Sequence, residues 1–306
     1  MNHSWRITGT IKPQKLTESK LQLHYAIQFI AATGSALAEP QPDYSNTSLE
    51  WNPELEVFGG AIIRAKTSVR VALDPIRLTS IILDKQGNAI AEFPLHQKTM
   101  AEGLSWHKQE ISKLGADAAN IVFLSYPPDD FPDHPVAHGA TFDAAEESAR
   151  QELTNYYANT HHLLQQIVAK TEYASPIHIW PHHFDIATLI SLPDTKNGEP
   201  MSIGIGLSPR DTSYEEPYWY VSPYPYPDMN NLPMLSGNGF WHTQHWLGAV
   251  LTASRLAIPV EGNGDIKAAE TQQQQVEAFF YSALNESQAL LKTDERVLSF
   301  DTQSHI

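Results

Sequence analysis

The apolar positions of the first 126 residues predict a helix, a group of short strands and a second helix. Thr17 can cap a helix that runs to about Ala38, because apolar residues recur there at helical spacing. Strand-like alternation follows in four short runs, at 55–63, 68–73, 78–83 and 89–94. A helix over 100–114, which ends at Gly115, and a strand over 121–126 complete this part.

The second part begins with a long helical pattern over about 142–170. Strand-like stretches follow at 175–192, 201–207 and 218–221. Thr243 is then expected to cap a helix that runs to Ala257, and a last helix covers about 265–291. Residues 127–140, between the two parts, are rich in Pro and Asp, which predicts a connector that runs over the surface.

The two parts have a similar order of elements. The stretch that begins at Trp51 has the same position in the first part as the stretch that begins at Trp180 has in the second. In the same way, SVRVALDP at 68–75 resembles SIGIGLSP at 202–209. We therefore expect an internal duplication, with a scaffold half at 16–126 and a functional half at 141–292. The alternative is that two amphipathic strands, each ending in a Pro turn, look alike by chance.

These elements predict an α+β fold, with antiparallel strands in one or two sheets and the longer helices packed on them. The strands come in runs between helices, without the regular β–α alternation that parallel folds require. A chain of 306 residues with 42% hydrophobic content can build the core of such a fold, so we expect 1–306 to form a single compact unit.

Composition argues against several classes of function. The chain carries 35 acidic residues against 20 basic ones and has no basic run, which disfavours a nucleic-acid surface. No apolar run reaches the roughly 18 residues of a membrane span, and the first residues lack the apolar segment of a signal peptide. We therefore expect a cytoplasmic protein without a membrane partner. The absence of cysteine excludes disulfides, thiolate metal sites and a cysteine nucleophile.

Candidate chemistry begins with the strand-like stretch 175–192, which carries three histidines and an aspartate. On a strand, His178 and His182 share one face, and His183 and Asp185 share the other. Pro181 suggests a bulge that turns His182 and His183 to the same side. One carboxylate beside two imidazoles is typical of a metal site. The alternative is that these imidazoles bond backbone carbonyls and that Asp185 only orients one of them.

A second group of histidines lies at Trp241-His-Thr-Gln-His-Trp246. With Thr243 as the helix cap, His245 lies in the first turn, where the helix dipole favours a neutral imidazole. His242 is three residues before His245, a spacing that can converge on one metal ion. We therefore expect His182, His183, Asp185, His242 and His245 to hold a divalent metal such as zinc or iron. The alternative is that His242 packs against the core and His245 faces solvent.

The segment 214–227 holds six aromatic residues and four prolines, which excludes a helix. Tyr218 and Tyr220, together with Trp180, are the side chains that we expect to wall a ligand pocket. Glu215 and Glu216 stand at the entrance of this segment as candidate catalytic acids. The alternative is a loop packed over the core, with both glutamates solvated.

Four segments together resemble an uncharacterised, mostly bacterial family that is classed as a domain of unknown function. They are SPIHIWPHHFDIATLISL, IGIGLSPRD, YEEPYWYVSPYPYPD and FWHTQHWLGAVLTASRL. The resemblance is dense over 175–257 and implies that these segments belong to one unit. The family has no established activity, so the resemblance implies no catalytic residue.

Three functions are compatible with these observations. The first is a metal-dependent enzyme that acts on a small molecule through the histidines and Asp185. The second is a non-catalytic protein that binds a small molecule against the aromatic segment. The third is a structural or partner-binding protein in which the histidines serve the fold. For the first, at least one of His182 and His183 should lie near His242 or His245. The sequence does not define the oligomeric state.

Overall fold

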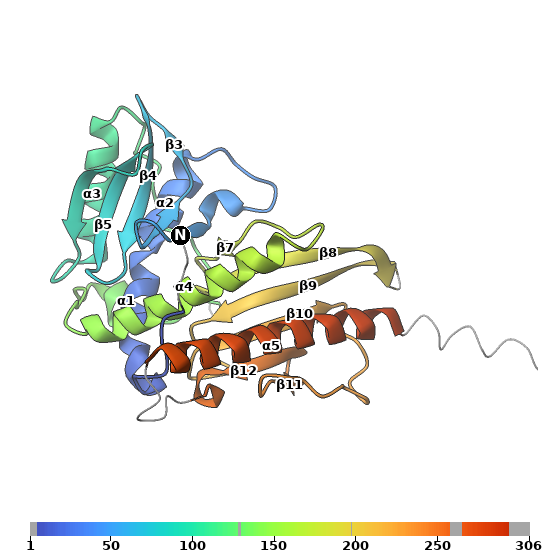
Figure 1. Ribbon diagram of the computed structural model, residues 1–306. Helices are drawn as coiled ribbons and strands as arrows, with labels where there is room; N and C mark the ends of the chain where they lie inside the picture. Colours follow the sequence, from blue (N-terminus) through green and yellow to red (C-terminus); the bar gives the residue numbers. More distant parts are fainter. Residues whose placement is uncertain (1–4, 128–129, 197, 258–264, 294–306) are drawn as a thin grey trace, which may run out of the picture.

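The computed structural model describes residues 5–127, 130–196, 198–257 and 265–293. Its described strands form one twelve-stranded sheet that runs through both halves of the chain, with helices packed against it (Figure 1). Neighbouring strands in this sheet are antiparallel. The predicted α+β class is therefore confirmed. No helix within the described ranges is long and apolar enough to cross a membrane.

The helices and strands have the following bounds. The α-helices are α1 (Thr17–Ala26), α2 (Gln28–Leu37), α3 (Met100–Lys113), α4 (Glu147–Val168) and α5 (Asp265–Thr293). The strands of the first half are β1 (Leu49–Asn52), β2 (Val57–Gly60), β3 (Ile63–Arg64), β4 (Ser68–Asp74), β5 (Thr79–Asp84) and β6 (Ala89–Pro94). Those of the second half are β7 (His178–Ile179), β8 (Ile186–Lys196), β9 (Glu199–Ser208), β10 (Tyr218–Tyr224), β11 (Phe240–His242) and β12 (Gly248–Thr252). Short 3₁₀ helices are η1 (Pro13–Leu16), η2 (Ser45–Thr47), η3 (Pro135–His138) and η4 (Ala253–Arg255).

The two halves meet at the centre of the sheet. The strand order is β11-β12-β10-β9-β8-β7-β1-β2-β4-β5-β6, with β3 paired to β4. At the junction Leu49 of β1 faces Ile179 of β7. The two segments that were matched in the sequence, 68–75 and 202–209, fall mainly on β4 and β9, which are each the third strand outward from this junction. This arrangement is compatible with a duplication, which stays a prediction.

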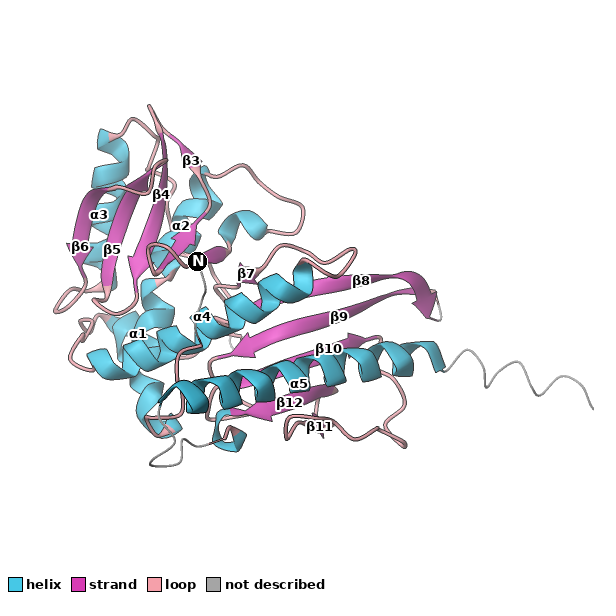
Figure 2. Cartoon of the chain, in the orientation of Figure 1, coloured by secondary structure: helices cyan, strands magenta, loops and turns pink. Residues whose placement is uncertain are grey.

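Helices α4 and α5 lie across the strands of the second half (Figures 1 and 2). Alternate residues of β9 and β10, such as Ile205 and Trp219, point to these helices and are buried. The indole N–H of Trp219 donates to the hydroxyl of Thr160 on α4 over 2.8 Å, so its one polar atom is satisfied in the core. Burying each large side chain of this kind contributes roughly 1.5–3 kcal/mol. The side chains between these residues point to the opposite face of the strands.

Helices α2 and α3 pack on the first half of the sheet. Thr99 begins α3 with a capping box, in which its hydroxyl accepts from the Glu102 N–H and the Glu102 carboxylate accepts from Thr99. Gly103 faces the ring of Phe29, and a Cβ added there would lie 2.4 Å from the ring atom Cζ. The helix therefore carries a glycine in its interior because a neighbouring helix needs the space.

Several predicted elements differ from the structure. The helix expected over 17–38 is two helices, separated at Ile27, and 121–126 forms no strand. The helix expected from Thr243 to Ala257 is wrong, because this stretch turns from β11 into the buried strand β12 and ends in η4. A short apolar run such as 247–251 fits a buried strand or a buried helix equally well, so its pattern could not separate the two.

Candidate functional site

The stretch WPHHFD is a tight turn between β7 and β8, and not the continuous strand that its apolar pattern predicted. The backbone N–H of Trp180 donates to the carbonyl of Asp185 over 2.9 Å, and the N–H of Phe184 donates to the carbonyl of Trp180 over 2.7 Å. Phe184 has a φ of 59°, in the left-handed region. Pro181 has no N–H to continue the ladder. The alternation of faces expected for these histidines is therefore wrong.

The turn brings His182 and His183 together, with ring centroids 4.3 Å apart. His183 is exposed, whereas His182 is half-buried near the ring of Tyr126. Burial first, and then the neighbouring His183, lower the pKa of His182 to about 4. His182 is therefore neutral near pH 7.

Helix α1 lies against this turn through His24, which is buried. A carbonyl can only accept, so His24 Nε2–H donates to the carbonyl of Pro181 over 2.9 Å. Nδ1 of the neutral ring is then an acceptor, and it receives a hydrogen bond from the ammonium of Lys20 over 3.2 Å. The ring also stacks on Phe184 at 5.3 Å. Burial first, and then the charge of Lys20, lower the pKa of His24 well below its ordinary value, which keeps the ring neutral.

Lys20 is a buried cation, with only 5% of its surface exposed. Burial lowers its pKa to about 8, and the positive charge of Arg210 acts in the same direction, whereas the carboxylate of Asp211 raises it. Lysine is rarely buried without a carboxylate partner, because its charge is costly to remove from water. Lys20 instead bonds a neutral imidazole, which makes it the most unusual charged group near the turn.

Asp185 ends the turn, and its carboxylate accepts a hydrogen bond from the hydroxyl of Tyr220 on β10 over 2.6 Å. Burial raises the pKa of the Asp185 carboxyl, although the bond from Tyr220 and the charge of His183 act to lower it. Burial and the neighbouring Asp185 raise the pKa of Tyr220 well above its ordinary value, so the phenol keeps its proton and donates.

Arg210 and Asp211 follow the end of β9. The Asp211 carboxylate accepts from the hydroxyl of Tyr218 and from the backbone N–H groups of Ser213 and Tyr214, so the loop wraps around it. Nε of Arg210 is buried and has no hydrogen-bond partner among the described residues. The other end of the Arg210 guanidinium lies 3.8 Å from the exposed Glu215.

These groups come from one helix and from the adjacent ends of three strands. We call them the Lys20 cluster, which comprises Lys20, His24, Asp185, Arg210, Asp211, Tyr218 and Tyr220. Electrostatic effects connect its members across these elements, since the charges of Arg210 and Asp211 act on Lys20 and that of Asp211 acts on Asp185. The predicted residues Asp185, Tyr218 and Tyr220 belong to the cluster.

The other two histidines of the expected metal set are His242, at the end of β11, and His245, in the turn that follows it. His242 Nε2–H donates to the carbonyl of Gln244 over 2.6 Å, and its Nδ1 accepts from the hydroxyl of Tyr214 over 2.8 Å. Both nitrogens are therefore occupied, and the ring stacks on Trp246. His245 is exposed in the turn after β11, with a φ of 69°. Within the described ranges, no three His, Asp or Glu side chains have an arrangement that fits a metal ion.

The two candidate acids and Trp180 differ in their contacts and exposure. Glu216 accepts from both the backbone N–H and the hydroxyl of Ser254, so it fastens its loop to η4. Glu215 has a side chain that is 82% exposed. Trp180 is half-buried beside the ring of His178, at a centroid distance of 5.3 Å.

Sequence reasoning missed Lys20, His24 and Arg210. One signal was available. Lys20 and His24 are four residues apart and lie among the apolar positions of α1, so the pattern predicts that both polar side chains face the core. Arg210 stood within the segment IGIGLSPRD, but no spacing rule connects it with a lysine 190 positions earlier in the chain. Only the packing of α1 on the β7–β8 turn brings them near one another.

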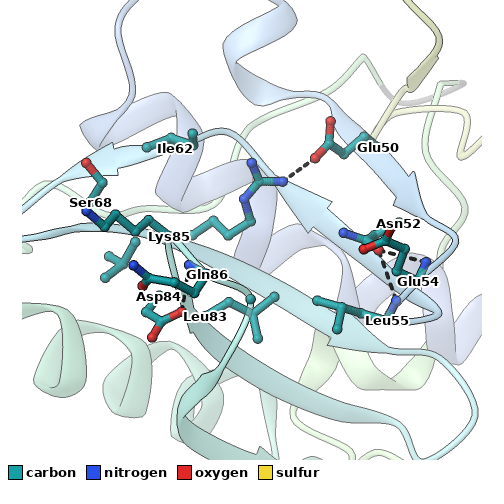
Figure 3. A pocket seen from close by; sticks show the side chains of 13 residues that line it. Glu50, Asn52, Glu54, Leu55, Ile62, Ser68, Leu83, Asp84, Lys85 and Gln86 are labelled. Atoms are coloured by element: carbon teal, nitrogen blue, oxygen red, sulfur yellow. Dashed lines mark hydrogen bonds and ion pairs between the residues drawn. The ribbon is translucent and has the colours of Figure 1, made fainter.

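Several hollows lie outside this cluster. One, of about 270 Å³, is on the first half of the sheet, where Arg70 pairs with Glu50 (Figure 3). Its other lining residues include Asn52, Ser68, Asp84, Lys85 and Gln86. A second hollow, of about 390 Å³, is lined mainly by aromatic and apolar side chains, among them Tyr25, Met100, Phe123, Tyr126 and Phe131. Neither hollow is lined by a residue that the sequence predicted for the site.

Comparisons with protein-family models, with curated proteins and with solved structures found no match for this chain. The resemblance to an uncharacterised bacterial family therefore stays a prediction. What the residues can do chemically must be argued from the geometry of the Lys20 cluster.

Proposed function

We propose that the protein is an enzyme that binds a small molecule at the Lys20 cluster and transfers a proton to or from it. The observation that carries the proposal is the half-buried Asp185, whose carboxylate is bonded to Tyr220 in the same cluster as the buried Lys20. Groups whose pKa values are shifted by burial gather at sites of function more often than elsewhere. Here a carboxyl group with a raised pKa and an amine with a lowered one lie in a single cluster.

Each residue has a distinct role in this proposal. Asp185 is the proton donor or acceptor, because a raised pKa brings a carboxyl group closer to the pH at which it can do both. Tyr220 is a positioning residue, since its hydrogen bond fixes the carboxylate. His24 is a second positioning residue, because its Nδ1 holds the Lys20 ammonium. Tyr218 acts in the same way on Asp211.

A metal-dependent reaction is the alternative that the sequence favoured. The donor set does not support it, because both nitrogens of His242 have protein partners and His245 lies in a separate exposed turn. The zinc or iron site thus stays a prediction. Its test is the metal content of protein that is purified without an affinity tag. One equivalent of tightly held metal in the wild type, lost in His182→Ala, would support a metal-dependent reaction.

The proposed function is tested with a ligand screen followed by two variants. Small molecules that raise the melting temperature of the wild type identify ligands, because a ligand of the folded state stabilises it. Each ligand is then incubated with the protein in D₂O and examined for conversion or deuterium uptake by NMR. We expect Asp185→Asn to bind such a ligand and to lose about 10²–10⁴-fold in the rate of conversion or exchange.

The matched control is Asp194→Asn, at an exposed aspartate on β8, the strand that follows Asp185. It should react as the wild type does. A wild type that binds ligands but neither converts them nor exchanges their protons would leave a binding protein as the function. Equal rates in Asp185→Asn and the wild type would remove Asp185 from the proposed chemistry.

A further inference from the structure

Two cations, Lys20 and Arg210, converge on the Lys20 cluster from different elements. Lys20 lies on α1, and Arg210 follows β9, yet the charge of Arg210 acts directly on Lys20. Two positive charges brought together in a partly buried place repel one another. Such an arrangement costs folding free energy unless negative charge compensates for it, and the carboxylate of Asp211 raises the pKa of Lys20 by less than Arg210 lowers it.

The protein leaves donors of both cations unused. An ammonium has three hydrogens, and the hydrogen bond shown for Lys20 within the described ranges goes to the neutral His24. Arg210 Nε is buried and has no acceptor among the same residues. A buried donor without an acceptor typically costs about 1–3 kcal/mol, so unused donors in a folded protein need a reason.

The carboxylates of the cluster, within the described part of the chain, accept their hydrogen bonds from other donors. Asp211 accepts from Tyr218 and from two backbone N–H groups, and Asp185 accepts from Tyr220. Glu215 lies 3.8 Å from the outer end of the Arg210 guanidinium and is mostly in water. The imidazole of His24 is neutral and can supply no negative charge.

We propose that the Lys20 cluster recognises an oxyanion, with the group held between the Lys20 ammonium and Nε of Arg210. This inference rests on the proposed function and names its substrate class: a small molecule with a carboxylate or phosphate group. A carboxylate or phosphate accepts charge-assisted hydrogen bonds from both cations and neutralises their repulsion. Asp185 and Tyr220 belong to the same cluster, where the proton-transfer chemistry is proposed to occur.

The test measures the binding of inorganic phosphate and of succinate by calorimetry and by melting temperature, at constant ionic strength with chloride as the reference. The variants are Lys20→Met and Arg210→Gln, which each remove one charged donor. The matched controls are Lys85→Met and Arg64→Gln, because both residues are exposed on the first half. We expect the wild type to bind at least one of the two anions in a saturable manner.

Each cluster variant should weaken this binding about 10- to 100-fold, as expected for the loss of one charge-assisted hydrogen bond, and the controls should bind as the wild type does. Binding of phosphate but not succinate would indicate a phosphate group in the substrate, and the reverse would indicate a carboxylate group. Wild type that binds neither anion, or binding that the cluster variants leave unchanged, would overturn the inference.

The result also separates this inference from the proposed function. If neutral molecules bind and are converted in a manner that depends on Asp185, while neither anion binds, the proposed function stands and the oxyanion inference fails. If the anions bind through Lys20 and Arg210 but Asp185→Asn leaves all conversion intact, the inference stands and the acid–base role fails.

Discussion

At the scale of single residues, Lys20 shows how a buried charge can reduce stability. Its pKa is lowered to about 8, so between that value and 10.5 the unfolded chain binds more protons than the folded protein. Stability must therefore rise with pH across this window and fall as pH decreases through 8. The charged form costs the folded protein about 3 kcal/mol near pH 7, from the size of the shift.

We predict that Lys20→Met removes this pH dependence. Relative to the variant, the wild type should gain about 3 kcal/mol in the free energy of unfolding between pH 7 and pH 10.5. Urea unfolding of both proteins at several pH values measures the difference, in which the titration of other groups cancels. A difference that stays flat across the window would mean that Lys20 is not a desolvated cation.

The sequence singled out candidate residues only where unusual residue types lay in one short segment. Asp185, Tyr218 and Tyr220 stood in unusual local sequences and do lie in the Lys20 cluster. His242 stood in an equally unusual sequence, but its nitrogens are used by Tyr214 and a nearby carbonyl. Local composition thus identifies a residue that needs partners, but only the fold determines which partners it finds.

At the scale of elements, prediction succeeded where a pattern was long or strongly capped. The helices α3 and α5 and the hairpin β5–β6 have nearly the bounds that the sequence indicated. Among the failures were the WPHHFD turn and the strand β12, whose short patterns do not separate turn, strand and helix. Their structure is decided by pairing with strands that are distant in the sequence, such as the pairing of β12 with β10.

In helix α3, the packing of Gly103 favours glycine, whereas helix propensity favours alanine. Alanine is the better helix former by about 1 kcal/mol, yet a Cβ at Gly103 would lie 2.4 Å from the Phe29 ring. We predict that Gly103→Ala lowers the free energy of unfolding by about 1–3 kcal/mol, because overpacking outweighs propensity. The control is Ser105→Ala, at an exposed position of the same helix, which should be neutral or slightly stabilising. Chemical unfolding of both variants decides this, and a stabilised Gly103→Ala would show that Phe29 moves aside without cost.

At the scale of the whole molecule, the halves expected from the sequence are closely joined. Trp5, near the start of the described chain, donates its indole N–H to Gln272 of α5 over 3.3 Å. Phe58 of the first half contacts the rings of Tyr157 and Phe184 of the second. The core is accordingly continuous between the halves. The sequence could indicate a duplication, but it could not show that the supposed scaffold half supplies Lys20 and His24 to the other half.

This joining predicts that neither half folds alone. A fragment of residues 141–306 lacks α1, so the carbonyl of Pro181 loses its His24 partner, and Phe184 loses both His24 and Phe58 as covering groups. We expect this fragment and its counterpart 1–140 to show poorly dispersed NMR spectra separately and a native-like spectrum when they are mixed. The intact chain should unfold in one cooperative transition, because its sheet and core are shared. A fragment 141–306 that is folded by itself would contradict this expectation, and its ligand binding would then test whether Lys20 is needed. Under the present proposal such a fragment binds neither phosphate nor succinate, since it lacks one of the two cations that hold the anion.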